Sequence, residues 1–391
     1  MKKSLIAMAV AGAFVAPAAM AEVTISGAIN LGIEMSKSSG GSGGGDSLTR
    51  TQLNANYSNI NISSTDDIGN GNKVVFNYQL VVNPGLTSGN PVNRNSYLGI
   101  AGNWGAFKMG TNENVYERHM YQADPLDGAL GPGGNLMILG TPGANTAFDV
   151  GNNCAADSDA TTAGTQIGGC AGFYRRTDHT IWYESPNWNG FTFEVDYTLS
   201  AFKTQGPGSV DPKVLSIGGK YAPEGMPFYV DVAYEKHDDM FGVNKITGQT
   251  DGTGSSDTGL QFGVGYMIGD LGLHARYEQL KYEVDGTAAA ITEYKRNAYW
   301  FGVKYNMPSG YIGAELGIAQ EGETNAGDAN DTGAKMFGIG YFHNLSKQSQ
   351  LQFIYGRTDN DDAATYTQAA APLGTAGSDH QVFHVGIKHT F

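Results

Sequence analysis

Apolar and polar residues alternate one by one along several short stretches of this chain. In FTFEVDYTL (191–199) every second residue is aromatic or aliphatic, and the residues between them are Thr, Glu and Asp. The same period of two recurs in KVVFNYQL (73–80) and FYVDVAYE (228–235). Alternation of this kind predicts β-strands with one apolar face and one polar face. Runs of about eight to ten residues also match a tilted strand that crosses the hydrocarbon layer of a membrane.

The connections between these predicted strands fall into two length classes that take turns along the chain. Short connections occur at 187–190, 222–227, 268–270, 306–310 and 344–349. Long polar connections occur roughly at 35–49, 84–93, 112–178, 201–213, 238–258, 285–295, 321–334 and 358–379. We therefore expect an all-β fold, a transmembrane antiparallel β-barrel of about sixteen strands, with short periplasmic turns and long extracellular loops.

The polar faces of the predicted strands indicate a water-filled interior. They carry Lys, Glu, Asp, Thr and Gln, which a dry protein core would accommodate only at a high free-energy cost. Closure of about sixteen strands leaves an aqueous channel, and it also leaves no backbone edge unpaired in lipid. No stretch in the body of the chain has eighteen consecutive apolar residues, which excludes helical membrane spans. A soluble all-β protein is the alternative, but it has no reason to segregate its loops by length.

The N-terminus predicts export. Residues 1–21 combine Lys2 and Lys3, a short apolar run and an Ala-Met-Ala ending, which is the pattern of a cleaved signal peptide. The mature barrel domain is then 22–391. The formal net charge is −14, and removal of the two lysines leaves 22 basic against 38 acidic residues, or −16. Such a surface is a poor partner for nucleic acid.

Several motifs together carry a family resemblance. DDIGNGNKVVFNYQL, NSYLGIAGNWGAFKMGTNEN, the N-terminal segment and the ending VGIKHTF are similar to those of Gram-negative general porins of the neisserial and Burkholderia type. The resemblance covers 22–391. It implies a homotrimer in the outer membrane, passive diffusion of small hydrophilic solutes and ions, and a third loop folded into the lumen. It also implies that Phe391, the terminal aromatic, is read by the outer-membrane barrel assembly machinery.

The third long connection holds the candidate site. Four of its carboxylates are expected to line a constriction opposite basic wall residues, because opposed charges create a transverse field that favours polar, compact solutes. The acidic candidates are Glu113, Glu117, Asp124 and Asp127, and the basic ones are Arg50, Lys73, Arg94 and Lys108. Lys220 and Lys304 also have lumen-facing parity. The alternative is that the acidic residues are solvated loop charges.

Two cysteines, Cys154 and Cys170, occur in the same connection. An exported protein meets an oxidising compartment, so we expect a disulfide between them. A disulfide that closes a loop of about fifteen residues stabilises the folded state by roughly 3 kcal/mol, because it lowers the chain entropy of the unfolded state. Two cysteines without a neighbouring histidine pair fall short of a metal ligand set.

No residue set predicts catalysis. Gly40-Gly41-Ser42-Gly43-Gly44 matches G-x-S-x-G, but it lies in a flexible Gly/Ser run without the strand and helix of a nucleophile elbow. The eight histidines are scattered, and His384 has lumen-facing parity. The acidic runs at Asp238–Asp239 and Asp359–Asp362 solvate the outer rim, or alternatively bind divalent cations shared with lipopolysaccharide.

The sequence therefore predicts a general diffusion porin that is not an enzyme and needs no cofactor. Acidic loops favour a weak cation preference, although the lumen lysines oppose it. The alternatives are a substrate-preferring porin of the same fold, an outer-membrane barrel hydrolase and an adhesin. The expected partners are outer-membrane lipids and lipopolysaccharide.

Overall fold

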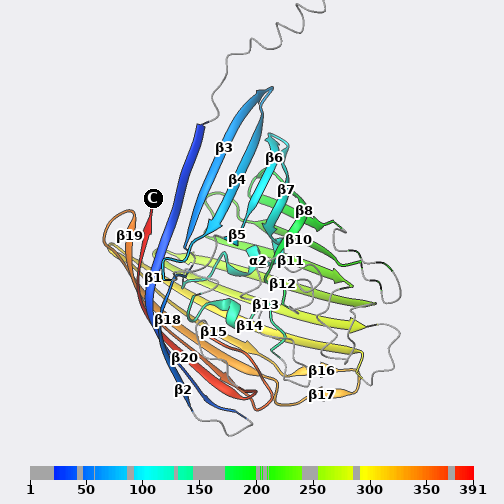
Figure 1. Ribbon diagram of the computed structural model, residues 1–391, viewed down its shortest axis with the longest axis vertical. Helices are drawn as coiled ribbons and strands as arrows, with labels where there is room; N and C mark the ends of the chain where they lie inside the picture. Colours follow the sequence, from blue (N-terminus) through cyan, green and yellow to red (C-terminus); the bar gives the residue numbers. More distant parts are fainter. Residues whose placement is uncertain are drawn as a thin grey trace, which may run out of the picture.

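A single antiparallel sheet closes on itself in the computed structural model of the protein (Figure 1). The structure describes residues 22–41, 47–56, 58–85, 92–126, 131–143, 172–199, 203, 205, 209, 211–239, 254–284, 291–368 and 375–391. The ring is completed where β1 (Glu22–Gly40) pairs with β20 (Ser378–Thr390), from Ala28 opposite Thr390 to Gly40 opposite Ser378. This closure confirms the predicted barrel.

The remaining elements follow in chain order around the ring. The first half contains β2 (Leu48–Asn54), β3 (Asn59–Gly69), β4 (Asn72–Val81), β5 (Val92–Asn93), β6 (Ser96–Gly102), β7 (Gly105–Glu113), the helix α2 (Val115–Tyr121), the short 3₁₀ helix η1 (Asn135–Met137), β8 (Arg176–Glu184) and β9 (Phe191–Thr198). The second half contains β10 (Lys213–Tyr221), β11 (Phe228–Asp238), β12 (Ser255–Ile268), β13 (Leu271–Val284), β14 (Glu293–Met307), β15 (Gly310–Ala319), β16 (Gly322–Thr324), β17 (Gly327–Ala329), β18 (Ala334–Asn344) and β19 (Ser349–Asn360). Among the described residues, no helix is long and apolar enough to cross a bilayer.

Sixteen segments cross from one rim of the barrel to the other, which confirms the predicted number. β2 and β3 pair with successive halves of β1 and form one interrupted crossing. β5 and β6 pair with β4 in the same way. β16 and β17 are a small hairpin within a long connection between β15 and β18.

The two rims differ as the sequence predicts. The short turns that follow β3, β6, β8, β10, β12, β14 and β18 lie at one end, and the strand ends that border the long connections lie at the other (Figure 1). Strands extend further towards the long loops than alternation indicates: β1 continues to Gly40, and β12 begins at Ser255. Antiparallel pairing continues there because backbone hydrogen bonds do not require an apolar face.

The outer face of the barrel is apolar and exposed. Phe262 of β12 is 49% exposed and Phe301 of β14 is 47% exposed, whereas Gln261 and Trp300, the residues before them in each strand, face inward and are buried. At the short-turn rim, Trp104 stacks on Tyr183 with ring centroids 6.3 Å apart, and Trp188 stacks on Phe193 at 5.8 Å. Aromatic residues at this level are typical of the membrane–water interface of outer-membrane barrels. The outer surface therefore matches a lipid-facing wall.

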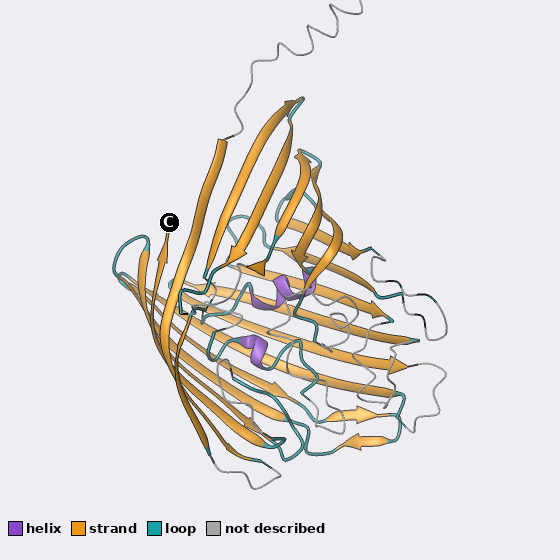
Figure 2. Cartoon of the chain, in the orientation of Figure 1, coloured by secondary structure: helices purple, strands orange, loops and turns teal. Residues whose placement is uncertain are grey.

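The described parts of the third long connection, residues 114–126, 131–143 and 172–175, lie inside the barrel, as predicted; we call them the constriction loop. It contains α2 and η1, drawn in purple within the ring of strands in Figure 2. Its apolar side chains pack on inward-facing residues of the wall and form the main buried cluster of the described chain, which includes Tyr116, Met120, Leu136, Ile138, Phe173, Leu280, Tyr282, Trp300 and Met336. One side of the lumen is thus a dry core. For the rest of the lumen, a wet interior stays a prediction.

Candidate functional site

The constriction loop begins with a helix whose N-terminus is capped by the barrel wall. The first N–H groups of a helix have no partner within the helix. Here Val115 N donates to Asp196 Oδ2 of β9 at 2.8 Å, and Tyr116 N donates to Ser216 Oγ of β10 at 2.9 Å. The N-cap residue Asn114 accepts from Glu117 N at 3.2 Å. A carboxylate at this end also complements the helix dipole, so the wall fixes where α2 starts.

A buried ion pair holds the middle of the constriction loop. Arg296 of β14 donates through Nη1 to Glu278 Oε1 of β13 at 2.9 Å, and both side chains are fully buried. Glu278 also accepts from Gly140 N, at 2.9 and 2.8 Å to its two oxygens, and from the Tyr116 hydroxyl at 3.1 Å. Gly140 has a φ of 69°, a conformation that a residue with a Cβ rarely adopts. The loop therefore turns its amide towards the carboxylate.

The same ion pair also holds carbonyl groups of the loop. Arg296 Nη2 donates to the carbonyl of Ile138 at 3.2 Å and to that of Thr141. Charged groups can be buried only when hydrogen bonds satisfy them. Glu278 and the two terminal nitrogens of Arg296 meet this condition through their bonds to the loop backbone, which fix its distance from the wall, while Arg296 Nε is buried without a partner among the described residues.

The root of the constriction loop brings two predicted site residues together. Glu113, at the end of β7, forms ion pairs with Arg94 at 3.5 Å and with Arg176 of β8, and it accepts from the Tyr121 hydroxyl. The Glu113 and Arg94 side chains are only 6% and 5% exposed. This cluster closes the base of the loop. A pore-lining role for Glu113 and Arg94 stays a prediction.

Asp124 lies at a bend within the constriction loop. It accepts from Leu126 N at 2.7 Å and from Asn135 N at 3.0 Å, so it joins the segment after α2 to η1. Leu126 packs beside it on Phe342 and Ile354 of the opposite strands. The fourth acidic candidate, Asp127, lies outside the described residues, as do Cys154, Cys170 and the predicted signal peptide 1–21.

Charged pairs that are more open to the lumen lie on the other side of α2. Lys108, a predicted residue of β7, binds both oxygens of Glu184 at 2.7 Å. Arg118 of α2 forms an ion pair with Glu194 of β9. The side chains of Glu184 and Glu194 are 35% and 29% exposed. Arg118 and Glu184 were not among the site residues predicted from the sequence. Two signals could have identified them: Arg118 is adjacent to the predicted Glu117, and Glu184 occupies an inward-facing position of β8.

Two predicted basic residues lie away from this centre. Arg50 in β2 is opposite Ser36 of β1, and Lys73 in β4 is opposite Ala101 of β6, so both face inward, as was expected for Lys73. Both are exposed, and neither forms an ion pair with a described residue. They lie near opposite rims, and their contribution to the constriction stays a prediction. His384 faces inward as expected, where it binds Glu34 at 3.1 Å.

Acidic loop residues find partners within the chain. Asp238 pairs with Lys236 at 2.7 Å, and Asp359 pairs with Arg357 at 2.6 Å. Within the described ranges, no group of three or more His, Cys, Asp or Glu side chains is arranged to hold a metal ion. Divalent cation binding at the rim stays a prediction.

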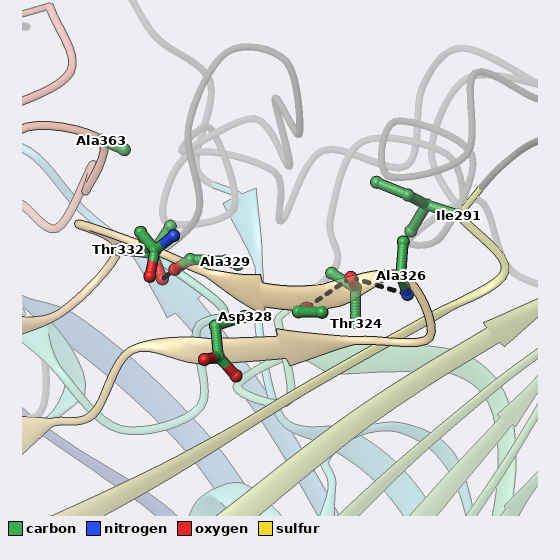
Figure 3. Close-up of a pocket in the computed structure, with 9 residues that line it drawn as sticks. Ile291, Thr324, Ala326, Asp328, Ala329, Thr332 and Ala363 are labelled. Carbon is green, nitrogen blue, oxygen red and sulfur yellow. Dashed lines mark hydrogen bonds between the residues drawn. The ribbon is translucent and has the colours of Figure 1, made fainter.

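A cavity of about 380 Å³ lies at the β16–β17 hairpin (Figure 3). It is lined by Thr324, Asp328, Thr332 and neighbouring small residues, together with Ile291 and Ala363 from adjacent connections. No described residue of the constriction loop borders it. The cavity therefore belongs to the loop rim and is separate from the charged passage.

Glu117 of α2 gives the site a testable pH dependence. Burial raises the pKa of its carboxyl group from 4.5 to about 7, and Oε2 accepts no hydrogen bond from any described residue. Between pH 4.5 and about pH 7, Glu117 therefore binds more protons in the folded state than in the unfolded state. The stabilisation of the folded state that comes from protonated Glu117 is present below pH 4.5 and is lost as the pH rises through about 7.

Glu117→Gln should remove this dependence, because the amide is neutral at every pH. We expect the variant to match the native protein at pH 4 and to be more stable at pH 8, by at most about 3 kcal/mol. Chemical denaturation of the purified protein at both pH values measures the difference. Glu323→Gln, on an exposed hairpin, is the control. An equal effect of Glu117→Gln at both pH values would contradict the prediction.

Known proteins share both the sequence pattern and this architecture. The Gram-negative porin family matches residues 7–363. Outer membrane porin protein 32 of Delftia acidovorans is 26% identical over 404 residues, covering all of both chains. A major outer membrane protein P.IB of Neisseria meningitidis is 26% identical over 242 residues, 61% of each chain. A solved structure described as an anion-selective porin from Comamonas acidovorans has a TM-score of 0.72 at 23% identity, covering 95% of this chain and 100% of the other.

Proposed function

The chain belongs to the Gram-negative porin family of the outer membrane, and we propose that it is a general diffusion channel for ions and small hydrophilic solutes. The single observation that carries this proposal is the constriction loop. It occupies one side of a closed sixteen-stranded barrel and leaves charged, partly exposed side chains on the other side. Such a passage selects solutes by size and charge, and it does not need to bind one particular compound tightly. Catalysis has no part in this proposal.

The lumen charges favour anions over cations. The acidic candidates Glu113 and Glu117 are buried within the root and helix of the constriction loop. Lys220, in contrast, is half-buried on the wall, where its Nζ donates to Gln122 Oε1 at 2.6 Å and lies 4.8 Å from the centroid of Tyr229. It forms no ion pair with a described residue. Lys304 Nζ lies 3.9 Å from the centroid of Tyr311.

Local charges act on a permeating ion more strongly than distant rim charges, which salt screens. We therefore propose an anion preference in place of the weak cation preference that total charge predicts. The relative described as an anion-selective porin supports this choice.

Reversal potentials under a potassium chloride gradient test both proposals. We expect stepwise conductance with chloride more permeant than potassium. Lys220→Gln combined with Lys304→Gln should lower the chloride-to-potassium permeability ratio about threefold or more, because two positive charges leave the lumen wall. Lys213→Gln with Lys236→Gln, near the extracellular ends of β10 and β11, is the matched control. Absence of conductance would refute the channel, and potassium preference in the native protein would refute the anion preference.

We also propose a homotrimer. Trimers are typical of related porins, and one structure of similar fold, OmpT of Vibrio cholerae, is described as a trimer form. The exposed apolar outer face supplies a surface for subunit packing as well as for lipid. Binding to lipopolysaccharide and to the barrel assembly machinery stay predictions.

A further inference from the structure

We infer that the outer face of β13 and β14 contains a docking site for a phosphorylated glycolipid of the outer membrane. The site consists of three pairs of residues that lie directly opposite each other on these two adjacent strands (Figure 1). In order towards the long loops, the pairs are Tyr277 with Tyr299, Gln279 with Asn297, and Lys281 with Lys295. We call these six residues the outer ladder. The inference concerns the membrane-facing wall and goes beyond the proposed channel function, which depends on the lumen.

All six side chains of the outer ladder point away from the lumen. Successive residues of a strand face opposite sides of the sheet. The residues that alternate with the ladder are buried on the lumen side, and they include Glu278 and Arg296, the ion pair that holds the constriction loop. The ladder residues are half-buried or exposed. They therefore face the surroundings of the barrel.

The outer ladder lies at the border between the apolar band and the loop rim. From Tyr299 to Met307, at the end of β14, the outward residues are apolar or aromatic, and the strand covers about 27 Å. A tilt of about 40° reduces this length to about 20 Å, most of the apolar height of about 25 Å that outer-membrane barrels show. Asn297 and Lys295 come next on the side of the long, extracellular loops. They therefore lie at the level of the headgroups of the outer leaflet.

The middle pair of the outer ladder presents amide groups on a wall that is otherwise apolar. Asn297 Oδ1 accepts from the Tyr277 hydroxyl at 2.9 Å and from Gln279 Nε2 at 3.0 Å. Gln279 Nε2 also lies 3.3 Å from the Tyr277 hydroxyl oxygen. These bonds fix both amides, while Asn297 Nδ2 and Gln279 Oε1 bond to no described residue. The pair therefore offers one donor and one acceptor to hydroxyl and amide groups of a sugar headgroup.

The last pair of the outer ladder brings two ammonium groups together. Like charges directly opposite each other destabilise the pairing of two strands. Lys281 is partnered by Glu283 at 2.8 Å and by Glu293 at 3.3 Å, and Lys295 is partnered by Glu323 at 3.6 Å. These glutamate side chains are 40–62% exposed, and exposed ion pairs contribute little to stability. A phosphate can thus exchange with them and bridge both lysines through its several acceptor oxygens.

The order of the three pairs matches one occupant. Aromatic rings, amides and ammonium groups follow one another towards the loops, as acyl chains, a hydroxyl- and amide-bearing sugar and phosphate do in a phosphorylated glycolipid. Anionic headgroups are attracted to lysines at a membrane surface. A second copy of this chain would have to bury the two ammonium groups, and charges are buried only against matched partners. The lipid phosphate supplies this match.

Native mass spectrometry of the full-length mature protein in detergent tests the site. The probes are diphosphorylated lipid A, the same lipid without its phosphates, and phosphatidylglycerol, which is anionic but has no sugar. We expect diphosphorylated lipid A to bind at concentrations at least about tenfold lower than the other two lipids. Lys281→Gln with Lys295→Gln should weaken its binding about tenfold. Gln279→Leu with Asn297→Leu should reduce its advantage over phosphatidylglycerol.

The matched control is Lys213→Gln with Lys335→Gln, two outward lysines that directly face Asp238 and Asp359 and no second lysine. It should keep native lipid affinity. Equal binding of the two forms of lipid A, or native affinity after the Lys281 and Lys295 substitutions, would overturn the site.

Two further outcomes would also overturn the glycolipid site. One is binding of phosphatidylglycerol as tight as that of diphosphorylated lipid A. The other is disulfide cross-linking between two copies of Lys295→Cys in outer membranes, because a second subunit would then cover this face. If a double variant does not fold, its two single variants give the same comparison. Single-channel conductance of the Lys281 and Lys295 variants should stay native, so failure of this site leaves the proposed channel intact.

Discussion

Arg296→Met should release the constriction loop and lower the free energy of unfolding by about 3–5 kcal/mol, the usual effect of removing one partner of a buried ion pair. The substitution leaves Glu278 buried without its cation, and the carbonyls of Ile138 and Thr141 lose their donor. Because the loop occupies one side of the lumen, its release should widen the passage. Single-channel recording should show a larger and noisier conductance, and chemical denaturation should show the lower stability.

Two further variants make the Arg296 experiment specific. Lys295→Met changes the neighbouring residue of β14, which faces outward and pairs with Glu323 at 3.6 Å, so conductance and stability should stay close to native values. Glu278→Gln combined with Arg296→Met removes the uncompensated charge and keeps an acceptor for Gly140 N. It should recover most of the lost stability. Native conductance in Arg296→Met would show that other contacts alone position the loop.

Deletion of Phe391 should leave an exported protein that is poorly inserted in the outer membrane. In the structure Phe391 N donates to Gly27 O at 3.1 Å and Gly27 N donates to Phe391 O at 3.0 Å, at the seam between β1 and β20. Loss of two hydrogen bonds costs only about 1–3 kcal/mol, which many other seam bonds outweigh. We therefore expect the main loss to arise in assembly, the step at which we predict that the terminal aromatic is recognised.

Substitutions at Phe391 separate assembly from stability. Phe391→Ala keeps both backbone hydrogen bonds and should be inserted as poorly as the deletion, whereas Phe391→Tyr should be inserted normally. Refolding of purified Phe391→Ala into detergent should proceed as in the native protein. The measurements are the amount of heat-modifiable protein in outer-membrane fractions and the yield of refolding. Normal insertion of Phe391→Ala would contradict a role for the terminal aromatic.

The barrel was predictable because each strand repeats the same local signal. Alternation in 191–199 placed Phe191, Phe193 and Val195 outward, and their inward neighbour Glu194 reaches the lumen in the structure. The parity of Lys108, Lys220 and Lys304 was likewise correct, because a period of two assigns every side chain in a strand to one face. In the interrupted crossing β2–β3 the inward residues change from even-numbered in β2 to odd-numbered in β3, a shift within one crossing that a single run of alternation does not predict.

The constriction loop shows where the sequence stops being informative. Its length and carboxylates identified it as the third long connection, but nothing local indicates which atoms meet the wall. Glu278 and Arg296 appear in the sequence as two inward residues among many. Only the folded chain brings Gly140 to Glu278 and Ile138 to Arg296. Glu113 shows the same limit: its charge is visible in the sequence, but its burial against Arg94 and Arg176 is not.

The sequence by itself determined the approximate strand number, the inward or outward face of residues in regularly alternating strands, the order of short and long connections and the family. These properties depend on neighbours within a few residues, where covalent geometry fixes direction. The tertiary structure decided which lumen charges stay available to solutes, how the loop divides a dry core from a wet passage, and which lysine lies over which tyrosine. The position of the loop, which decides how the lumen is divided, depends on contacts between residues more than a hundred positions apart, such as Tyr116 with Glu278. Burial, which sets the free energy of each charge, exists only once such segments have met.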